Sequence, residues 1–167
     1  MLWYNVTNLS KGRLQMTQKL PPRKQRGIHA LRSAAQALHY EWNTAHTSLV
    51  LMSLAKRNSD QVLMNASLES FLIHARNICD FFDVRGRQDD ILAKDFLGRT
   101  PRARLTYIRK NKVRIHKRIA HLSYSRPRLK RGWASALMMK EIDGAMRVFI
   151  GRLKQKYRLI ARRVFGV

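Results

Sequence analysis

DQVLMNASLESFLIHARNICDFF, residues 60–82, is the stretch that decides the fold. Its apolar side chains recur at steps of three and four residues, which predicts a helix over about 60–82. Ser59 or Asp60 is suited to cap its N-terminus. The helix is apolar on most of its faces, and such a helix is usually central in a bundle. One polar stripe remains, because charged side chains recur at i, i+7, i+11 and i+14, namely Glu69, Arg76, Asp80 and Asp83.

The same helical spacing continues on both sides of this stretch. It predicts four further helices, over about 28–56, 89–96, 105–124 and 132–164. No segment alternates polar and apolar residues, and glycine is scarce, so we expect no strands. The expected fold is therefore all-α, a single bundle of about five helices over 27–167. Residues 1–26 are a basic lead-in that we expect to be disordered, and Met16 is an alternative start to Met1.

Charge is the dominant feature of the composition. Among 167 residues, 34 Lys and Arg oppose ten Asp and Glu, for a net charge of +24. The net charge is +7 over residues 1–40, −2 over 41–98 and +19 over 99–167. Such an excess of cations on the C-terminal part predicts a polyanionic partner, most often nucleic acid, with an anionic membrane surface as the alternative.

Cellular location is indicated by two features. No segment approaches the ~20 apolar residues that a membrane-spanning helix needs, so we expect no transmembrane segment. The single cysteine, Cys79, excludes a disulfide framework, and we interpret it as a small buried apolar residue. A cytoplasmic location is the expectation that fits both.

The predicted helix over 105–124 carries the residues best suited to chemistry. Arg114, Arg118 and His121 fall at i, i+4 and i+7 and therefore share one face. Histidine exchanges a proton near neutral pH, and a guanidinium holds a phosphate and neutralises charge that grows in a transition state. With the RNA 2′-hydroxyl as nucleophile, these groups are the minimum for a metal-independent ribonuclease.

The run Arg114-Ile115, five residues, His121 resembles the arginine–histidine motif of the HEPN superfamily. Many HEPN proteins are ribonucleases of toxin or phage-defence systems, and others are non-catalytic RNA-associated relatives. The resemblance implies a small helical bundle, a homodimer whose groove contains Arg114 and His121 of both subunits, and an antitoxin-type protein partner. Family motifs often have Asn, Asp or His after the arginine, where this chain has Ile115.

His121 also has a purely structural interpretation. It can pack against the polar stripe of the helix over 60–82, in a buried network that keeps the helices in register. Arg76 and Asp80 form a natural i, i+4 pair within that network. The supporting residues of either interpretation are Glu69, Arg76, Asp80, Asn111 and His116.

The basic C-terminal half supplies the predicted nucleic-acid contacts. RNA is favoured over DNA as the ligand because of the HEPN resemblance. Neither a metal ion nor another cofactor is expected, because no histidine pair has zinc-helix spacing and no glycine-rich phosphate loop occurs. Two alternatives stay open: a non-catalytic nucleic-acid-binding or adaptor protein, and a peripheral membrane protein held by its last helix. The candidate contacts are Arg109, Lys112, Lys117, Arg126, Arg128, Lys130, Arg131, Arg152, Lys156, Arg162 and Arg163.

Overall fold

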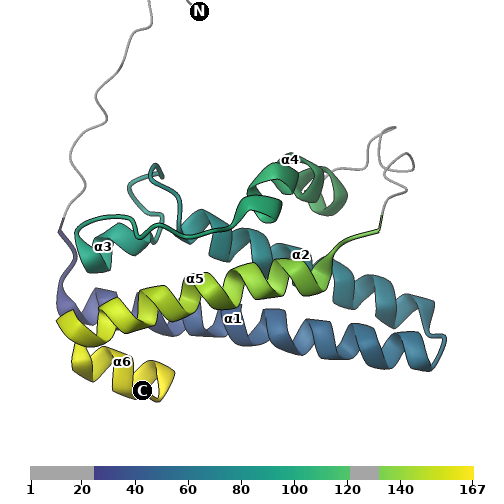
Figure 1. The fold of residues 1–167 in the computed structure, drawn as a ribbon, viewed down its shortest axis with the longest axis horizontal. Coiled ribbons are helices and arrows are strands. Elements are labelled where there is room, and N and C mark those ends of the chain that lie inside the picture. Colours follow the sequence, from purple (N-terminus) through teal and green to yellow (C-terminus); the bar gives the residue numbers. More distant parts are fainter. Residues whose placement is uncertain (1–24, 121–131) are drawn as a thin grey trace, which may run out of the picture.

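The computed structural model describes residues 25–120 and 132–167, and within these ranges every regular element is a helix. This confirms the all-α bundle, with six helices in place of about five (Figure 1). They are α1 (Ile28–Arg57), α2 (Gln61–Phe81), α3 (Ala93–Leu97), α4 (Thr106–Ala120), α5 (Ser135–Lys156) and α6 (Arg158–Phe165).

α1 and α2 form an antiparallel pair joined by a tight turn (Figure 1). α1 packs through its predicted apolar stripe, in which Leu31, Ala35, Leu38 and Ala45 are buried. Of the two residues proposed as caps, Asp60 is the one that acts, because its carboxylate accepts a hydrogen bond of 2.9 Å from the Leu63 amide. The bond satisfies an amide that has no partner within the helix.

α5 packs along the α1–α2 pair and completes the core (Figure 1). Its fully buried Phe149 lies at the centre of a cluster of aromatic rings. The ring centroid of Phe149 lies 5.0 Å from Phe81, 6.2 Å from Phe82, 5.4 Å from Phe96 and 6.4 Å from Phe165. These rings belong to the end of α2, to α3 and to α6, so one side chain of α5 connects three other parts of the bundle.

α3 is shorter than predicted, since it covers Ala93–Leu97 and not 89–96. Asp89 and Asp90 were expected at the N-terminus of the helix, but they lie in the preceding turn. There Asp90 accepts a hydrogen bond of 2.5 Å from the amide of Arg87. Asp95 accepts a bond of 2.9 Å from the amide of Leu92, so the acid that supports the start of α3 lies inside it.

The prediction of one helix over 132–164 is wrong, because the helix breaks at Tyr157 (φ −134°, ψ 63°). After this elbow, α6 folds back against α1 and α5 (Figure 1). Its Phe165 ring lies 5.5 Å from His39 of α1, and its Ile160 is buried. A continuous helix would carry these apolar side chains away from the bundle, so burial of α6 outweighs the helical geometry lost at one residue.

Within the described residues, we find no helix that combines the length and the apolar character needed to cross a membrane.

Candidate functional site

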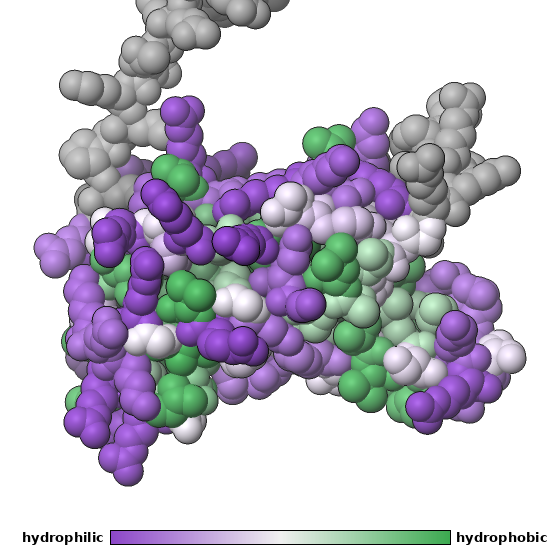
Figure 2. Space-filling model, viewed as in Figure 1, coloured by the Kyte–Doolittle hydropathy of each residue, from purple (hydrophilic) through white to green (hydrophobic). Residues whose placement is uncertain are grey.

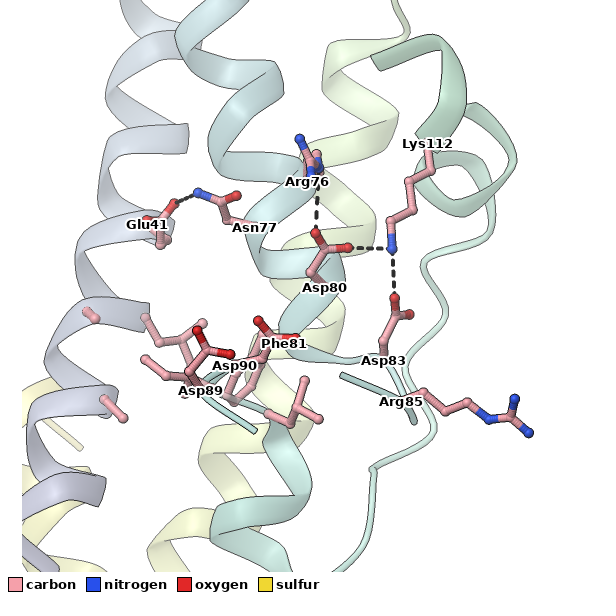
Figure 3. Close-up of a pocket in the computed structure, with 15 residues that line it drawn as sticks. Glu41, Arg76, Asn77, Asp80, Phe81, Asp83, Arg85, Asp89, Asp90 and Lys112 are labelled. Carbon is pink, nitrogen blue, oxygen red and sulfur yellow. Dashed lines mark hydrogen bonds and ion pairs between the residues drawn. The ribbon is translucent and has the colours of Figure 1, made fainter. Parts of the chain in front are cut away.

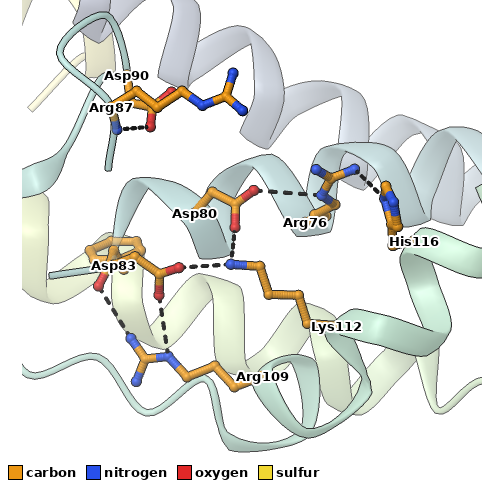
Figure 4. A network of polar contacts seen from close by, with 9 residues as sticks. Arg76, Asp80, Asp83, Arg87, Asp90, Arg109, Lys112 and His116 are labelled. Atoms are coloured by element: carbon orange, nitrogen blue, oxygen red, sulfur yellow. Dashed lines mark hydrogen bonds and ion pairs between the residues drawn. The ribbon is translucent and has the colours of Figure 1, made fainter. Parts of the chain in front are cut away.

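A network of charged side chains joins α2 to α4 (Figure 4). Its centre is Lys112, whose Nζ lies 2.5 Å from Oδ1 of Asp80 and 2.7 Å from Oδ2 of Asp83. The expected pair between Arg76 and Asp80 is present, with 3.5 Å between Nε and Oδ2. The polar stripe of α2 therefore faces α4, where it is matched by a cation.

Two further side chains of α4 extend the network at its ends (Figure 4). The guanidinium of Arg109 donates to the carbonyl oxygen of Phe82 over 3.2 Å and lies 3.9 Å from Oδ1 of Asp83. At the other end, Nδ1 of His116 lies 3.4 Å from a guanidinium nitrogen of Arg76. Among the described residues of α4, His116 is therefore the histidine that contacts the polar stripe of α2.

Lys112 is held in its charged form. Burial alone would lower the pKa of Lys112, but the hydrogen bonds and negative charges of Asp80 and Asp83 outweigh burial and raise it above 10.5. A lysine with a raised pKa in the folded state contributes stability that is complete below its unfolded pKa. That contribution is lost as the pH rises through the folded pKa.

We expect Lys112→Ala to lower the free energy of unfolding by about 1–2 kcal/mol, because two half-exposed carboxylates lose their shared cation. Lys117→Ala, a matched change at an exposed position of the same helix, is expected to have an effect below about 0.5 kcal/mol. Urea unfolding followed by circular dichroism measures both values, and equal losses would contradict a structural role for Lys112. The difference between the two variants should disappear at strongly alkaline pH.

A pocket of about 530 Å³ lies beside this network, between α1, α2 and the segment over 83–92 (Figure 3). Glu41 of α1 stands in its wall, where one carboxylate oxygen accepts from Asn77 over 3.0 Å and lies 2.7 Å from Nδ1 of His74. The pocket wall holds five of the ten acidic residues of the chain, Glu41, Asp80, Asp83, Asp89 and Asp90. Three cations, Arg76, Arg85 and Lys112, also line the wall, so five acids and three bases give it a net charge of −2. A net negative wall is a less favourable place for phosphate than a surface without acids.

The three catalytic candidates are only partly described. Arg114 is half-buried on α4, and its guanidinium carbon lies 4.0 Å from the ring centroid of Trp133, a cation–π contact. Arg118 lies on α4, but its side chain is outside the described residues, and so is the whole of His121. Of the proposed supporting residues, Asn111 donates to the carbonyl of Tyr107 over 2.9 Å within its own helix, and Glu69 is half-buried on α2.

Both acidic residues after position 98 form hydrogen bonds with groups on other helices of the bundle. Glu141 of α5 accepts hydrogen bonds of 2.9 and 3.0 Å from the amide of Tyr107 and one of 3.3 Å from that of Ile108, so it caps α4. Asp143 accepts 2.8 Å from Nε1 of Trp42 and lies 2.9 Å from Nε2 of His46. Neither carboxylate is left to balance the cations on the surface of α5 and α6.

These cations form what we term the C-terminal basic surface. Its members are exposed, and none forms an ion pair with a carboxylate of the described residues. Hydrophilic side chains alternate with smaller apolar patches on the face shown in Figure 2. The C-terminal basic surface consists of Lys140, Arg147, Lys154, Lys156, Arg158, Arg162 and Arg163.

The predicted nucleic-acid contacts divide into three groups. Lys117, Lys156, Arg162 and Arg163 are exposed, and Arg152 is half-buried. Arg109 and Lys112 form ion pairs with Asp80 and Asp83 within the bundle, so their charges are already partly balanced. Four members of the C-terminal basic surface were not among the predicted contacts, namely Lys140, Arg147, Lys154 and Arg158. The seven-residue spacing of Lys140, Arg147 and Lys154 is visible in the sequence. Four predicted contacts lie outside the described residues: Arg126, Arg128, Lys130 and Arg131.

Over residues 25–120 and 132–167, no group of three or more His, Cys, Asp or Glu side chains is arranged to hold a metal ion. In comparisons with protein-family models, curated proteins and solved structures, no match to the chain was found. The class of protein defined by fold and site is thus an α-helical bundle with a basic surface, and the HEPN resemblance stays a prediction from the Arg114–His121 motif.

Proposed function

We propose that this protein binds nucleic acid through the C-terminal basic surface, with RNA as the preferred ligand. The observation that carries the proposal is the occupation of Glu141 and Asp143 by α4 and α1, which leaves seven exposed cations without an ion pair to any carboxylate of the described residues. Lys140, Arg147 and Lys154 recur every seven residues, so they lie along one side of α5 about 10.5 Å apart. A row of cations of this kind follows a phosphate backbone.

The position of α6 argues against the alternative of a peripheral membrane protein. A helix bound to a membrane surface buries its apolar face in lipid. In this protein Ile160 and Ala161 of α6 are buried against the bundle, and Phe165 contacts rings of α1 and α5. Most of the apolar side chains of α6 are therefore used within the protein, with Leu159 left exposed.

Neutralising three members of the basic surface tests the proposal. In the triple variant Lys140→Gln, Arg147→Gln, Lys154→Gln, we expect RNA affinity to fall by about 10–100-fold, because roughly three phosphate contacts are removed. Fluorescence anisotropy with a labelled single-stranded RNA at low salt measures the change. Double-stranded DNA serves as the competitor that tests the preference for RNA.

The matched control removes the same charge elsewhere. Lys56→Gln, Arg57→Gln, Arg85→Gln alters three exposed cations on α1 and on the segment after α2. We expect this variant to lose less than about threefold in affinity, since only the long-range attraction of the net charge decreases. Equal losses in the two triple variants would show that binding follows net charge and does not use the C-terminal basic surface.

RNA cleavage without a metal ion is a second candidate function. It is favoured by the contact of Arg114 with Trp133, because stacking on an aromatic ring fixes the orientation of a guanidinium, the group best suited to hold a phosphate. We expect labelled RNA to be cleaved in the presence of EDTA by the unmodified protein, and His121→Ala to reduce the rate at least about 100-fold. RNA binding by His121→Ala should be unchanged. Cleavage that persists in this variant would exclude His121 as the proton-transfer group.

A further inference from the structure

A second pocket lies at the elbow, between the start of α1 and the junction of α5 with α6. Its volume is about 360 Å³, which suits one small ligand and is too small for a duplex. Part of its wall is apolar, formed by Ile28, Tyr157, Leu159 and Ile160. Ile28 and Leu159 are 51% and 67% exposed, so apolar surface is open to a ligand at this position.

The rest of the wall is polar, formed by His29 and four cations. Arg32 of α1, Lys156 at the end of α5, and Arg158 and Arg163 of α6 all line the pocket, and no acidic residue does so among the described residues. Nζ of Lys156 lies 5.3 Å from the ring centroid of Tyr157. The four cations come from three helices, and only the fold-back of α6 brings them to one cavity. The pocket beside Lys112 differs, because its lining includes five acidic residues.

Two helix N-termini add to the positive potential of this pocket. α1 begins at Ile28 and α6 at Arg158, and both residues line it. Neither helix has a side-chain hydrogen bond at its cap or an acidic residue in its first turn. The positive end of each helix dipole therefore favours an anion here, in addition to the four cations.

From this geometry we infer that the elbow pocket binds a nucleotide carrying a terminal phosphate, either a free mononucleotide or the phosphorylated end of a nucleic-acid strand. A terminal phosphomonoester carries close to two negative charges near neutral pH, about twice the charge of a backbone phosphate, and so fits a cluster of four cations. The base packs against Tyr157 and the apolar wall, since bases stack on aromatic side chains. The strand-end form of this inference rests on the proposed RNA binding, whereas the mononucleotide form does not.

Thermal unfolding of the full chain with adenosine 5′-monophosphate, adenosine or inorganic phosphate tests the pocket directly. We expect a Tm that rises with nucleotide concentration, because a ligand that binds only the folded protein stabilises it, and no rise with adenosine. Arg158→Gln, Arg163→Gln should weaken nucleotide binding at least about tenfold by removing charge-assisted contacts. Arg32→Gln tests the same pocket from α1. Lys56→Gln, Arg57→Gln is the matched control, because both residues are exposed and lie outside the pocket, and it is expected to bind the nucleotide normally.

A comparison of short RNAs with a 5′-phosphate, a 3′-phosphate or hydroxyls at both ends distinguishes the two sources of the ligand. A preference of at least about tenfold for a phosphorylated end, lost in Arg158→Gln, Arg163→Gln, identifies a strand end as the ligand. Equal RNA affinities together with nucleotide binding identify the free nucleotide. If the nucleotide raises Tm no more than adenosine does and no end preference is seen, the inference is overturned. In that case, tight binding of the hydroxyl-ended RNA would still support the proposed RNA binding. Failure of the elbow-pocket inference can therefore be distinguished from failure of the proposed function.

Discussion

RNA affinity should fall by about 10³–10⁴-fold when monovalent salt is raised from about 50 to 200 mM, if roughly seven to ten phosphates of a single strand are neutralised. The seven cations of the C-terminal basic surface are enough to supply contacts in this range. Each phosphate contact releases condensed counterions, and added salt opposes that release. Anisotropy titrations at several salt concentrations give the slope of log affinity against log salt.

The triple variant Lys140→Gln, Arg147→Gln, Lys154→Gln supplies the control for this slope. Its loss of three phosphate contacts should reduce the magnitude of the slope by about two for a single strand. The control triple variant on α1 and the segment after α2 should keep the original slope. A response to salt that is nearly flat in the unmodified protein would refute a phosphate-based interface.

Phe149→Ala is expected to lower the free energy of unfolding by about 3–5 kcal/mol. Phe149 is completely buried, and its ring contacts four other phenylalanine rings. Truncation removes buried apolar surface and edge-to-face contacts, and it leaves a cavity where α2, α3, α5 and α6 meet. Because Phe165 is among the contacts, α6 should lose protection against amide hydrogen exchange more than α1 does.

The neighbouring residue offers a matched control. Val148 lies beside Phe149 on α5, but it is 42% exposed. Val148→Ala should change the free energy of unfolding by less than about 0.5 kcal/mol, because little buried surface is lost. Chemical denaturation measures both variants, and a loss below about 1 kcal/mol for Phe149→Ala would contradict the central position of the ring.

Much of the fold can be predicted from periodicity and caps. The first helix was expected over 28–56 and covers Ile28–Arg57, and the second was expected over 60–82 and covers Gln61–Phe81. Both have long apolar stripes and a clear boundary around Asp60. The break at Tyr157 could not be predicted, because neither glycine nor proline marks it and good helix formers surround it. Tertiary packing of α6 decides that break.

The candidate sites could be predicted less completely. The pair of Arg76 and Asp80 follows from local spacing, since i, i+4 residues are neighbours on any helix. The partnership of Lys112 with Asp80 and Asp83 depends on the register between α2 and α4. The elbow pocket depends on the fold-back of α6. Neither arrangement is encoded in a short motif, because each joins residues far apart in the chain.

The cap that Glu141 provides for α4 has a consequence during translation. The amide of Tyr107 precedes its carboxylate partner by 34 positions in the chain. At about 5–20 residues per second, a ribosome adds that interval in roughly 2–7 s. Throughout this time the nascent α4 has no Glu141 to satisfy its first amides. Late synthesis of α5 thus sets the earliest moment at which α4 acquires its native N-terminus.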